Sequence, residues 1–142
     1  MPLTTDDEIR DLLQSARTVA LVGASDRPER ASFGVMETLL KHGYRVFPVN
    51  PTIAGGHVHG EFVYSNLLEI REPIDLVDIF RRADALEPII DDAIAANAKA
   101  VWMQLGVINE DVAARAEAAG MKVVMNRCPR IEIGRLRLPP VA

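Results

Sequence analysis

The stretch VALVGASDRPERASFG, residues 19–34, combines residue types that bind phosphate groups. An apolar run ends at Gly23 and is followed by small and polar residues. Backbone N–H groups of residues 24–26, and those at the start of a helix near Ser32 to Gly34, can point at phosphate oxygens. The segment therefore predicts an anion-binding turn, although an ordinary strand-to-helix loop has a similar composition.

The turn does not complete the G-x-G-x-x-G fingerprint of dinucleotide-binding proteins. Only the first glycine is present, as Gly23, because Ser25 and Pro28 occupy the other two places. The second apolar run ends at Asn50, where NAD-binding folds usually place an acid on the ribose hydroxyls. An amide can instead pair with adenine or a phosphorylated ribose, and Asn50-Pro51 also suits a simple turn. These differences count against NAD as the ligand.

Arginine is concentrated after the predicted strands of an otherwise acidic chain. The formal net charge is -4, yet 13 of the 16 basic residues are arginine. Guanidinium groups match phosphate oxygens in geometry, so several together indicate a ligand with several phosphate charges. Any one of them alone is better explained as a solvated surface residue, but all six together are not. The six in or next to the strand ends are Arg27, Arg30, Arg81, Arg82, Arg127 and Arg130.

Few other residues are arranged for catalysis or metal binding. His57 and His59 are two positions apart and would share one face of an extended segment, but no further metal ligands accompany them. Asp75 and Asp78 flank a buried strand, where we expect them to cap or to form ion pairs. The single cysteine, Cys128, excludes an internal disulfide and fits a reducing compartment. We predict no catalytic residue and no metal site.

Five apolar runs define the element pattern: TVALV, RVFPV, DLVDIF, AVWMQ and KVVM. They alternate with helical patterns at a spacing of about 25 residues, which is typical of βα units around a parallel sheet. Their near-continuous apolar character is required of strands that are covered on both faces. We predict an α/β fold with a doubly wound, Rossmann-like, five-stranded and mainly parallel sheet and helices on both faces. Ligands of such folds bind outside the carboxyl ends of the strands.

The connecting segments carry signals for helices and turns. The predicted helices are a peripheral N-terminal one within residues 1–16, one that Ser32 caps and Gly43 ends, one that begins with a capping box of Asp84 and Glu87, and one that Asn109 opens and Gly120 ends. Residues 51–70 are predicted to form a loop or small hairpin followed by a short helix. Residues 128–142 are predicted to be an Arg-rich C-terminal tail.

Length and composition bound the class of protein. A chain of 142 residues, 49% of them hydrophobic, is the size of one domain over residues 1–142. The N-terminus is acidic where a secretory signal is basic, and no segment approaches the roughly 18 apolar residues of a membrane span. The negative net charge argues against a general nucleic-acid surface. We expect a soluble, cytoplasmic protein without a membrane or nucleic-acid partner.

Five segments in order resemble one family, namely VALVGAS, GYRVFPVNP, PIDLVDIFRR, AVWMQLG and GMKVVMNRC. They are similar to the small stand-alone CoA-binding proteins, which are relatives of the N-terminal CoA-binding domain of the succinyl-CoA synthetase α subunit. The resemblance implies a Rossmann-like domain that holds coenzyme A across the strand ends. The predicted CoA-binding residues are Gly23, Ala24, Ser25, Arg27, Arg30, Ser32, Gly34, Asn50, Pro51, Phe80, Arg81, Arg82, Gln104 and Gly106.

The resemblance also implies how the ligand lies. The turn from Gly23 to Ser25 would cradle the phosphates, and Asn50 would lie at the nucleotide end. Pro51 would lie there too, and Phe80, Arg81 and Gln104 would lie along the pantetheine arm and the phosphates. Cys128 is expected to be buried, or to lie near the thiol of CoA if the arm reaches the fifth strand.

Three functions are compatible with these residues. The first is a non-catalytic CoA or acyl-CoA binding protein with a carrier, sensor or regulatory role, because the histidine used by succinyl-CoA synthetase relatives lies on a separate domain. The second is an NAD(P)-binding oxidoreductase-type subunit, which the fold favours and Asn50 opposes. The third is a structural or interaction domain without a working ligand site.

Overall fold

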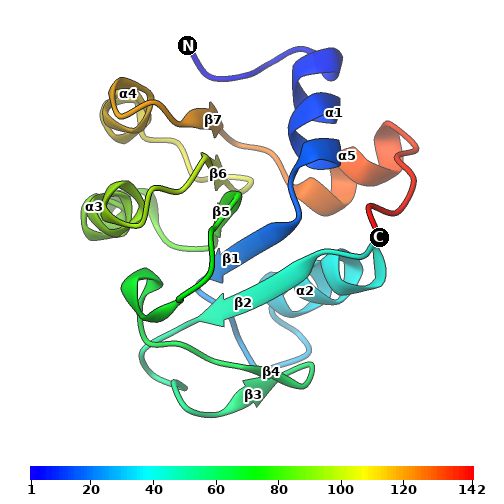
Figure 1. The fold of residues 1–142 in the computed structure, drawn as a ribbon, viewed down its shortest axis with the longest axis vertical. Coiled ribbons are helices and arrows are strands. Elements are labelled where there is room, and N and C mark those ends of the chain that lie inside the picture. Colours follow the sequence, from blue (N-terminus) through cyan, green and yellow to red (C-terminus); the bar gives the residue numbers. More distant parts are fainter.

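A five-stranded parallel sheet forms the centre of the computed structural model, which describes residues 1–142. Its strands, in spatial order, are β2 (Arg45–Val49), β1 (Thr18–Val22), β5 (Leu76–Ile79), β6 (Ala100–Met103) and β7 (Lys122–Val124). Every neighbouring pair is parallel (Figure 1), which confirms the doubly wound prediction. β1 and β2 have the predicted bounds, and the other three end one residue earlier than the apolar runs.

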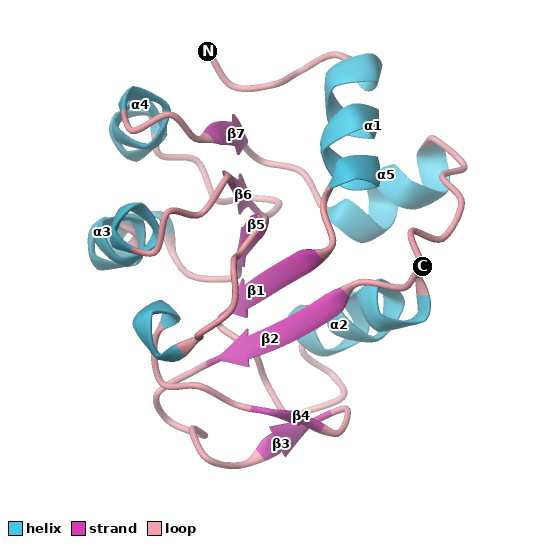
Figure 2. Cartoon of the chain, viewed as in Figure 1, coloured by secondary structure: helices cyan, strands magenta, loops and turns pink.

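Helices cover both faces of the sheet (Figure 2). Alternate residues of β1 belong to different cores, with Val19 and Leu21 in one and Ala20 and Val22 in the other. The first core also contains side chains of α1 (Asp6–Ser15), α2 (Ala31–Lys41) and α5 (Pro129–Arg135). The second contains those of α3 (Glu87–Ala95) and α4 (Glu110–Ala118).

The strand order places a topological switch point between β1 and β5. Along the chain, β2 adds to one side of β1, whereas β5, β6 and β7 follow one another on the other side. In such sheets the crossover connections leave a crevice at the carboxyl ends of the two strands where the order reverses. The carboxyl ends of β1 and β5 are therefore the expected position of a ligand site.

The segment between β2 and β5 forms a small hairpin and a short helix, as predicted. The hairpin pairs β3 (His57–Val58) with β4 (Glu61–Phe62), and the helix is a 3-10 turn, η1 (Leu67–Glu69). A bridge between Val49 and Tyr64 attaches this segment to the edge strand β2.

Two predicted helix starts are wrong. Ser32 does not cap α2, because the helix begins one residue earlier with Arg30 at its N-cap position, and Ser32 is buried in the first turn. The capping box is absent because Asp84 lies in a separate 3-10 turn, η2 (Ala83–Ala85), and α3 begins after Leu86 without a side-chain cap. Asn109 caps α4 as predicted by accepting the N–H of Val112.

Both chain ends contribute more to the core than the sequence predicted. The N-terminal helix α1 is not peripheral, since Ile9, Leu12 and Leu13 are buried in the first core. Residues 128–142 are not merely a tail, because α5 packs Ile133 into the same core. The helix buries Pro129, Glu132 and Ile133, whereas Ile131 remains exposed, so its buried side is not simply its apolar side. None of the helices has the length and apolar character that crossing a membrane needs.

Candidate functional site

Gly23 holds the loops after β1, β2 and β5 together at the switch point. Its φ is 88°, and a Cβ atom at this position would lie 2.5 Å from the carbonyl oxygen of Phe80. Only glycine tolerates both the conformation and the close approach. The N–H groups of Gly23 and Ala24 both donate to the carbonyl of Val49, at 2.9 and 3.2 Å. The predicted use of the Ala24 N–H for phosphate is therefore wrong, because that donor is already bonded.

A groove of about 750 Å³, here named the polar groove, opens beside Gly23. It lies between the β1–α2 loop, the end of β2 and the end of β5. The predicted residues that line it are Gly23, Ala24, Ser25, Arg27, Arg30, Ser32, Asn50, Phe80 and Arg81. Four further residues line it that were not predicted, namely Asp26, Ala31, Thr52 and Ile53.

The polar groove is rich in hydrogen-bond donors without partners. The backbone N–H groups of Ser25, Asp26, Ala31 and Ser32 have no acceptor within the protein. The guanidinium groups of Arg27, Arg30 and Arg81 form no ion pair, and Asp26 is the only carboxylate that lines the groove. Free N–H groups at a helix start and arginines without ion pairs are both donor types that suit anions.

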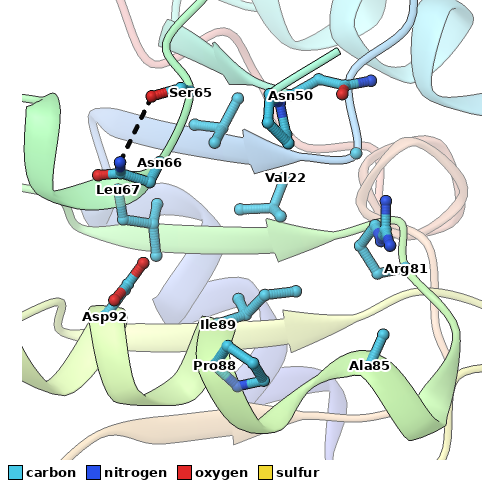
Figure 3. Close-up of a pocket in the computed structure, with 13 residues that line it drawn as sticks. Val22, Asn50, Ser65, Asn66, Leu67, Arg81, Ala85, Pro88, Ile89 and Asp92 are labelled. Carbon is cyan, nitrogen blue, oxygen red and sulfur yellow. Dashed lines mark hydrogen bonds between the residues drawn. The ribbon is translucent and has the colours of Figure 1, made fainter.

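A smaller cavity of about 260 Å³, the apolar pocket, lies on the other side of Gly23. Its walls are largely apolar and come from the ends of β1 and β2, from η1 and from α3. Figure 3 shows Arg81 at one end of the apolar pocket and Asp92 near Asn66 at the other, with Val22 and Ile89 between them. Asn66 donates to the Ser65 hydroxyl at 3.4 Å.

Gly23, Asn50 and Arg81 line both cavities. Pro51 lines the apolar pocket but not the polar groove. Asn50 donates from Nδ2 to the carbonyl of Ala24 at 2.8 Å and accepts the N–H of Thr52 on Oδ1 at 2.9 Å. Its side chain therefore builds the turn after β2 and binds that turn to the loop after β1. Together the cavities form one cleft with a cationic side and an apolar side.

Four predicted site residues lie outside this cleft. Gly34 is inside α2, where a Cβ would lie 3.0 Å from the guanidinium of Arg130. Arg82 pairs with Asp84 at 3.4 Å. The remaining two, Gln104 and Gly106, follow β6; Gln104 is buried without a hydrogen bond to Oε1, and Gly106 donates its N–H to Asn126 at 2.7 Å.

The histidines do not form a pair. His59 adopts a φ of 49°, and its ring lies on Phe33 with the centroids 4.0 Å apart. His57 instead contacts Phe62 edge-on. The prediction that both share one extended face is therefore wrong, because His59 lies in the turn of the hairpin. The structure has no group of three His, Cys, Asp or Glu side chains that could hold a metal ion.

Asp75, which precedes β5, and Asp78, which lies within β5, differ in their surroundings. Asp75 accepts the N–H groups of Arg17 and Thr18 and pairs with Lys99, as expected of a capping residue. Asp78 contradicts that expectation, since it is fully buried and neither carboxylate oxygen has a partner. Burial raises the pKa of Asp78 well above its usual value of 3.8. Asp78 lines neither cavity of the cleft.

Sequence reasoning could not find most of the apolar pocket. The predicted residues came from the strand ends, from the segment between β1 and α2 and from the first turn of α2, whereas Leu67, Pro88, Ile89 and Asp92 come from η1 and α3. No local motif marks these positions. Cys128 is buried with a 6% exposed surface, as one of the two interpretations expected, and it lines neither side of the cleft.

Comparisons with known proteins agree on one domain type. A family model described as a CoA binding domain matches residues 17–134. The chain is 36% identical over 124 residues to the uncharacterized protein YneT of Bacillus subtilis, covering 87% of this chain and 90% of YneT. It is also 30% identical over 88 residues to the alpha subunit of an ADP-forming acetate–CoA ligase of Pyrococcus furiosus, which covers 58% of this chain and 19% of that subunit.

A solved structure has the same fold. A hypothetical protein from Pyrococcus horikoshii superposes with a TM-score of 0.91 at 38% identity, covering 97% of both chains.

Proposed function

Because the chain belongs to the family of CoA binding domains, we propose that it binds coenzyme A or an acyl-CoA in the cleft at the ends of β1, β2 and β5. In this proposal the protein is a carrier, sensor or regulatory partner and not a catalyst. The phosphates occupy the polar groove, and an uncharged part of the ligand occupies the apolar pocket.

The observation that carries the proposal is the set of unpaired donors around Gly23. The polar groove is lined by three guanidinium groups without ion pairs, those of Arg27, Arg30 and Arg81. It is lined by only one carboxylate, so positive charge is in excess. Coenzyme A has a diphosphate and a 3′-phosphate, so its negative charge matches this excess of positive charge. A free helix start adds N–H donors for the same oxygens.

The pairing of a polar groove with an apolar pocket also suits this ligand. Coenzyme A joins phosphates to uncharged groups in one molecule, and the two cavities meet at Gly23, Asn50 and Arg81. A simple phosphate site would not need an adjoining pocket of about 260 Å³. The arrangement therefore favours a large nucleotide-containing ligand over a free anion.

An NAD(P)-binding subunit is less well supported. No carboxylate stands at the end of β2 to accept the ribose hydroxyls, and both polar groups of Asn50 are already used within the protein. The non-catalytic role is supported by the lining of the cleft. Its only carboxylates are Asp26 and Asp92, and neither His nor Cys lines either cavity.

A ligand comparison by thermal unfolding tests the proposal. At about 100 times its dissociation constant, CoA should add roughly 2.7 kcal/mol to the free energy of unfolding and raise Tm. NAD at the same concentration should give no shift. Equal shifts with both ligands, or a shift with NAD alone, contradict CoA as the ligand, and no shift with either supports a domain without a working site.

A further inference from the structure

A third cavity, of about 580 Å³, opens at the ends of β6 and β7, beyond the cleft. We name it the β7 groove. Its apolar lining comes from the N-terminal segment, the β6–α4 loop, the β7–α5 loop and α5. The side chains concerned are Leu3, Leu105, Ile108, Met125, Cys128 and Ile131.

Exposed apolar side chains gather at this groove. Leu105, Ile108 and Ile131 are 56%, 53% and 52% exposed, and all three line it. Besides Met1, only Phe62 and Leu68 are large apolar residues exposed elsewhere on the molecule. Apolar groups from separate segments that remain exposed around one concavity indicate a site for an apolar group.

The charged groups of the β7 groove are already paired with each other. Glu132 is buried and accepts hydrogen bonds from Arg127 at 2.7 Å and from Arg135 at 3.1 Å. Arg127 also donates to the carbonyl of Thr4, and Arg135 to Asp6. No cation remains free to bind an anionic group, so the groove favours an uncharged occupant.

Gln104 directly precedes Leu105, which lines the β7 groove, but its own side chain lines neither the cleft nor that groove. It follows β6, which separates β5 at the cleft from β7 at the groove. Its side chain is 6% exposed, and Oε1 is buried without a donor. A buried amide oxygen without a partner costs free energy, but Gln104 lines none of the three cavities, so this oxygen is not open to a ligand. The arm of CoA contains two amide groups.

The length of that arm matches the distance along the sheet. Neighbouring strands are about 4.8 Å apart, so the ends of β1 and β7, three spacings apart, are separated by about 14 Å. The arm has about thirteen bonds from phosphorus to sulfur and extends to about 16 Å at the rise of an extended chain. A CoA held by its phosphates in the polar groove can therefore place its sulfur at the β7 groove.

We propose that the β7 groove is an acyl subsite, so that the protein binds acyl-CoA with a short uncharged acyl chain more tightly than free CoA. This inference rests on the proposed function, because the phosphates must be held in the polar groove. The acyl chain lies against Leu105, Ile108 and Ile131, which line the β7 groove.

Calorimetric titration of the full chain with CoA, acetyl-CoA, butyryl-CoA, hexanoyl-CoA and succinyl-CoA tests the subsite. Affinity should rise by about twofold to fourfold for each methylene from acetyl to hexanoyl, because each buried methylene contributes to binding. Succinyl-CoA should gain nothing over CoA, because its carboxylate finds no free cation. If CoA binds but hexanoyl-CoA binds no tighter, the subsite is refuted and the proposed function stands. If no CoA compound binds, the proposed function itself fails.

Surface variants locate the effect. Ile108→Ser and Ile131→Ser should each lose most of the gain for hexanoyl-CoA while keeping the affinity for CoA, because both side chains are half exposed and outside the cleft. Leu68→Ser is the matched control, since Leu68 is 55% exposed and lines none of the three cavities. A gain for hexanoyl-CoA that survives in both variants places the acyl chain elsewhere and overturns the assignment.

Discussion

Arg81 lies at the junction of the two cavities, and in the proposed function ligand binding depends on it most directly. It lines both the polar groove and the apolar pocket and forms no ion pair. The next residue, Arg82, has the same chemistry but pairs with Asp84 at 3.4 Å outside the cleft. The two side chains therefore distinguish a specific contact from a general effect of positive charge.

Arg81→Ala should weaken CoA binding by about 10-fold to 150-fold, since a charge-assisted hydrogen bond contributes roughly 1.5 to 3 kcal/mol. Titration of the variant with CoA and with dephospho-CoA is the measurement. A larger loss for CoA assigns Arg81 to the 3′-phosphate, and equal losses assign it to the diphosphate. Arg82→Ala should leave both affinities nearly unchanged. Wild-type affinity in Arg81→Ala would remove this residue from the site.

At the scale of elements, α5 is anchored by one buried carboxylate. Glu132 on α5 forms ion pairs with Arg127 from the β7–α5 loop and with Arg135 from its own helix. Arg135 also forms an ion pair with Asp6 at the start of α1. Burial raises the pKa of Glu132, but hydrogen bonds from Arg135 and Arg127 outweigh burial, so the pKa lies below 4.5. The network joins both chain ends to the sheet.

Glu132→Gln should destabilise the fold by about 1 to 3 kcal/mol at neutral pH, because it removes a buried, charge-assisted set of bonds. A carboxyl with a lowered folded pKa stabilises above its unfolded pKa, and this contribution is lost as pH falls through the folded pKa. Denaturant unfolding from pH 7 down to 3 should therefore show the wild-type advantage over Glu132→Gln shrinking below about pH 4.5. Glu29→Gln, at an exposed carboxylate without an ion pair, is the control. A constant difference across this range would contradict the assignment.

At the scale of the whole molecule, Asp78 makes the core sensitive to pH in the opposite direction. It lies in register with Leu21 and Trp102, both of which face the core under α1, α2 and α5. Its raised pKa means that the folded state keeps the proton while the unfolded chain releases it. Stability from this group is therefore complete below the unfolded pKa and decreases as pH rises above it.

Asp78→Asn should make the protein more stable than the wild type near pH 8 and change little near pH 4, because asparagine keeps the volume and cannot ionise. The wild type should lose at most about 1.4 kcal/mol per pH unit through this group. Asp75→Asn should act in reverse, because hydrogen bonds from Arg17 and Thr18 lower the pKa of Asp75 despite its partial burial. The measurement is the free energy of unfolding in urea of the wild type, Asp78→Asn and Asp75→Asn near pH 4 and near pH 8. A wild type more stable than Asp78→Asn at pH 8 would show that Asp78 has a partner.

The sequence by itself determined the five strands, their parallel arrangement, the hairpin after β2 and the cap at Asn109. These features depend on local patterns, namely apolar runs, glycine and proline positions, and a single capping side chain. The same patterns placed Gly23, Asn50 and Arg81 at strand ends, and the structure brings them together at one cleft. Residues that directly follow parallel strands converge in any fold of this class.

Only the tertiary structure decided which of the six arginines face the same groove. Arg27, Arg30 and Arg81 converge, whereas Arg82 and Arg127 pair with carboxylates that no sequence spacing indicates. The apolar pocket and the β7 groove likewise arise between segments far apart in the chain. The burial of helix α5 and of the unpartnered Asp78 was likewise decided only by the tertiary structure, because burial depends on which faces of distant elements meet. Local patterns specify elements, and contacts between elements specify the cavities and the charges that remain free.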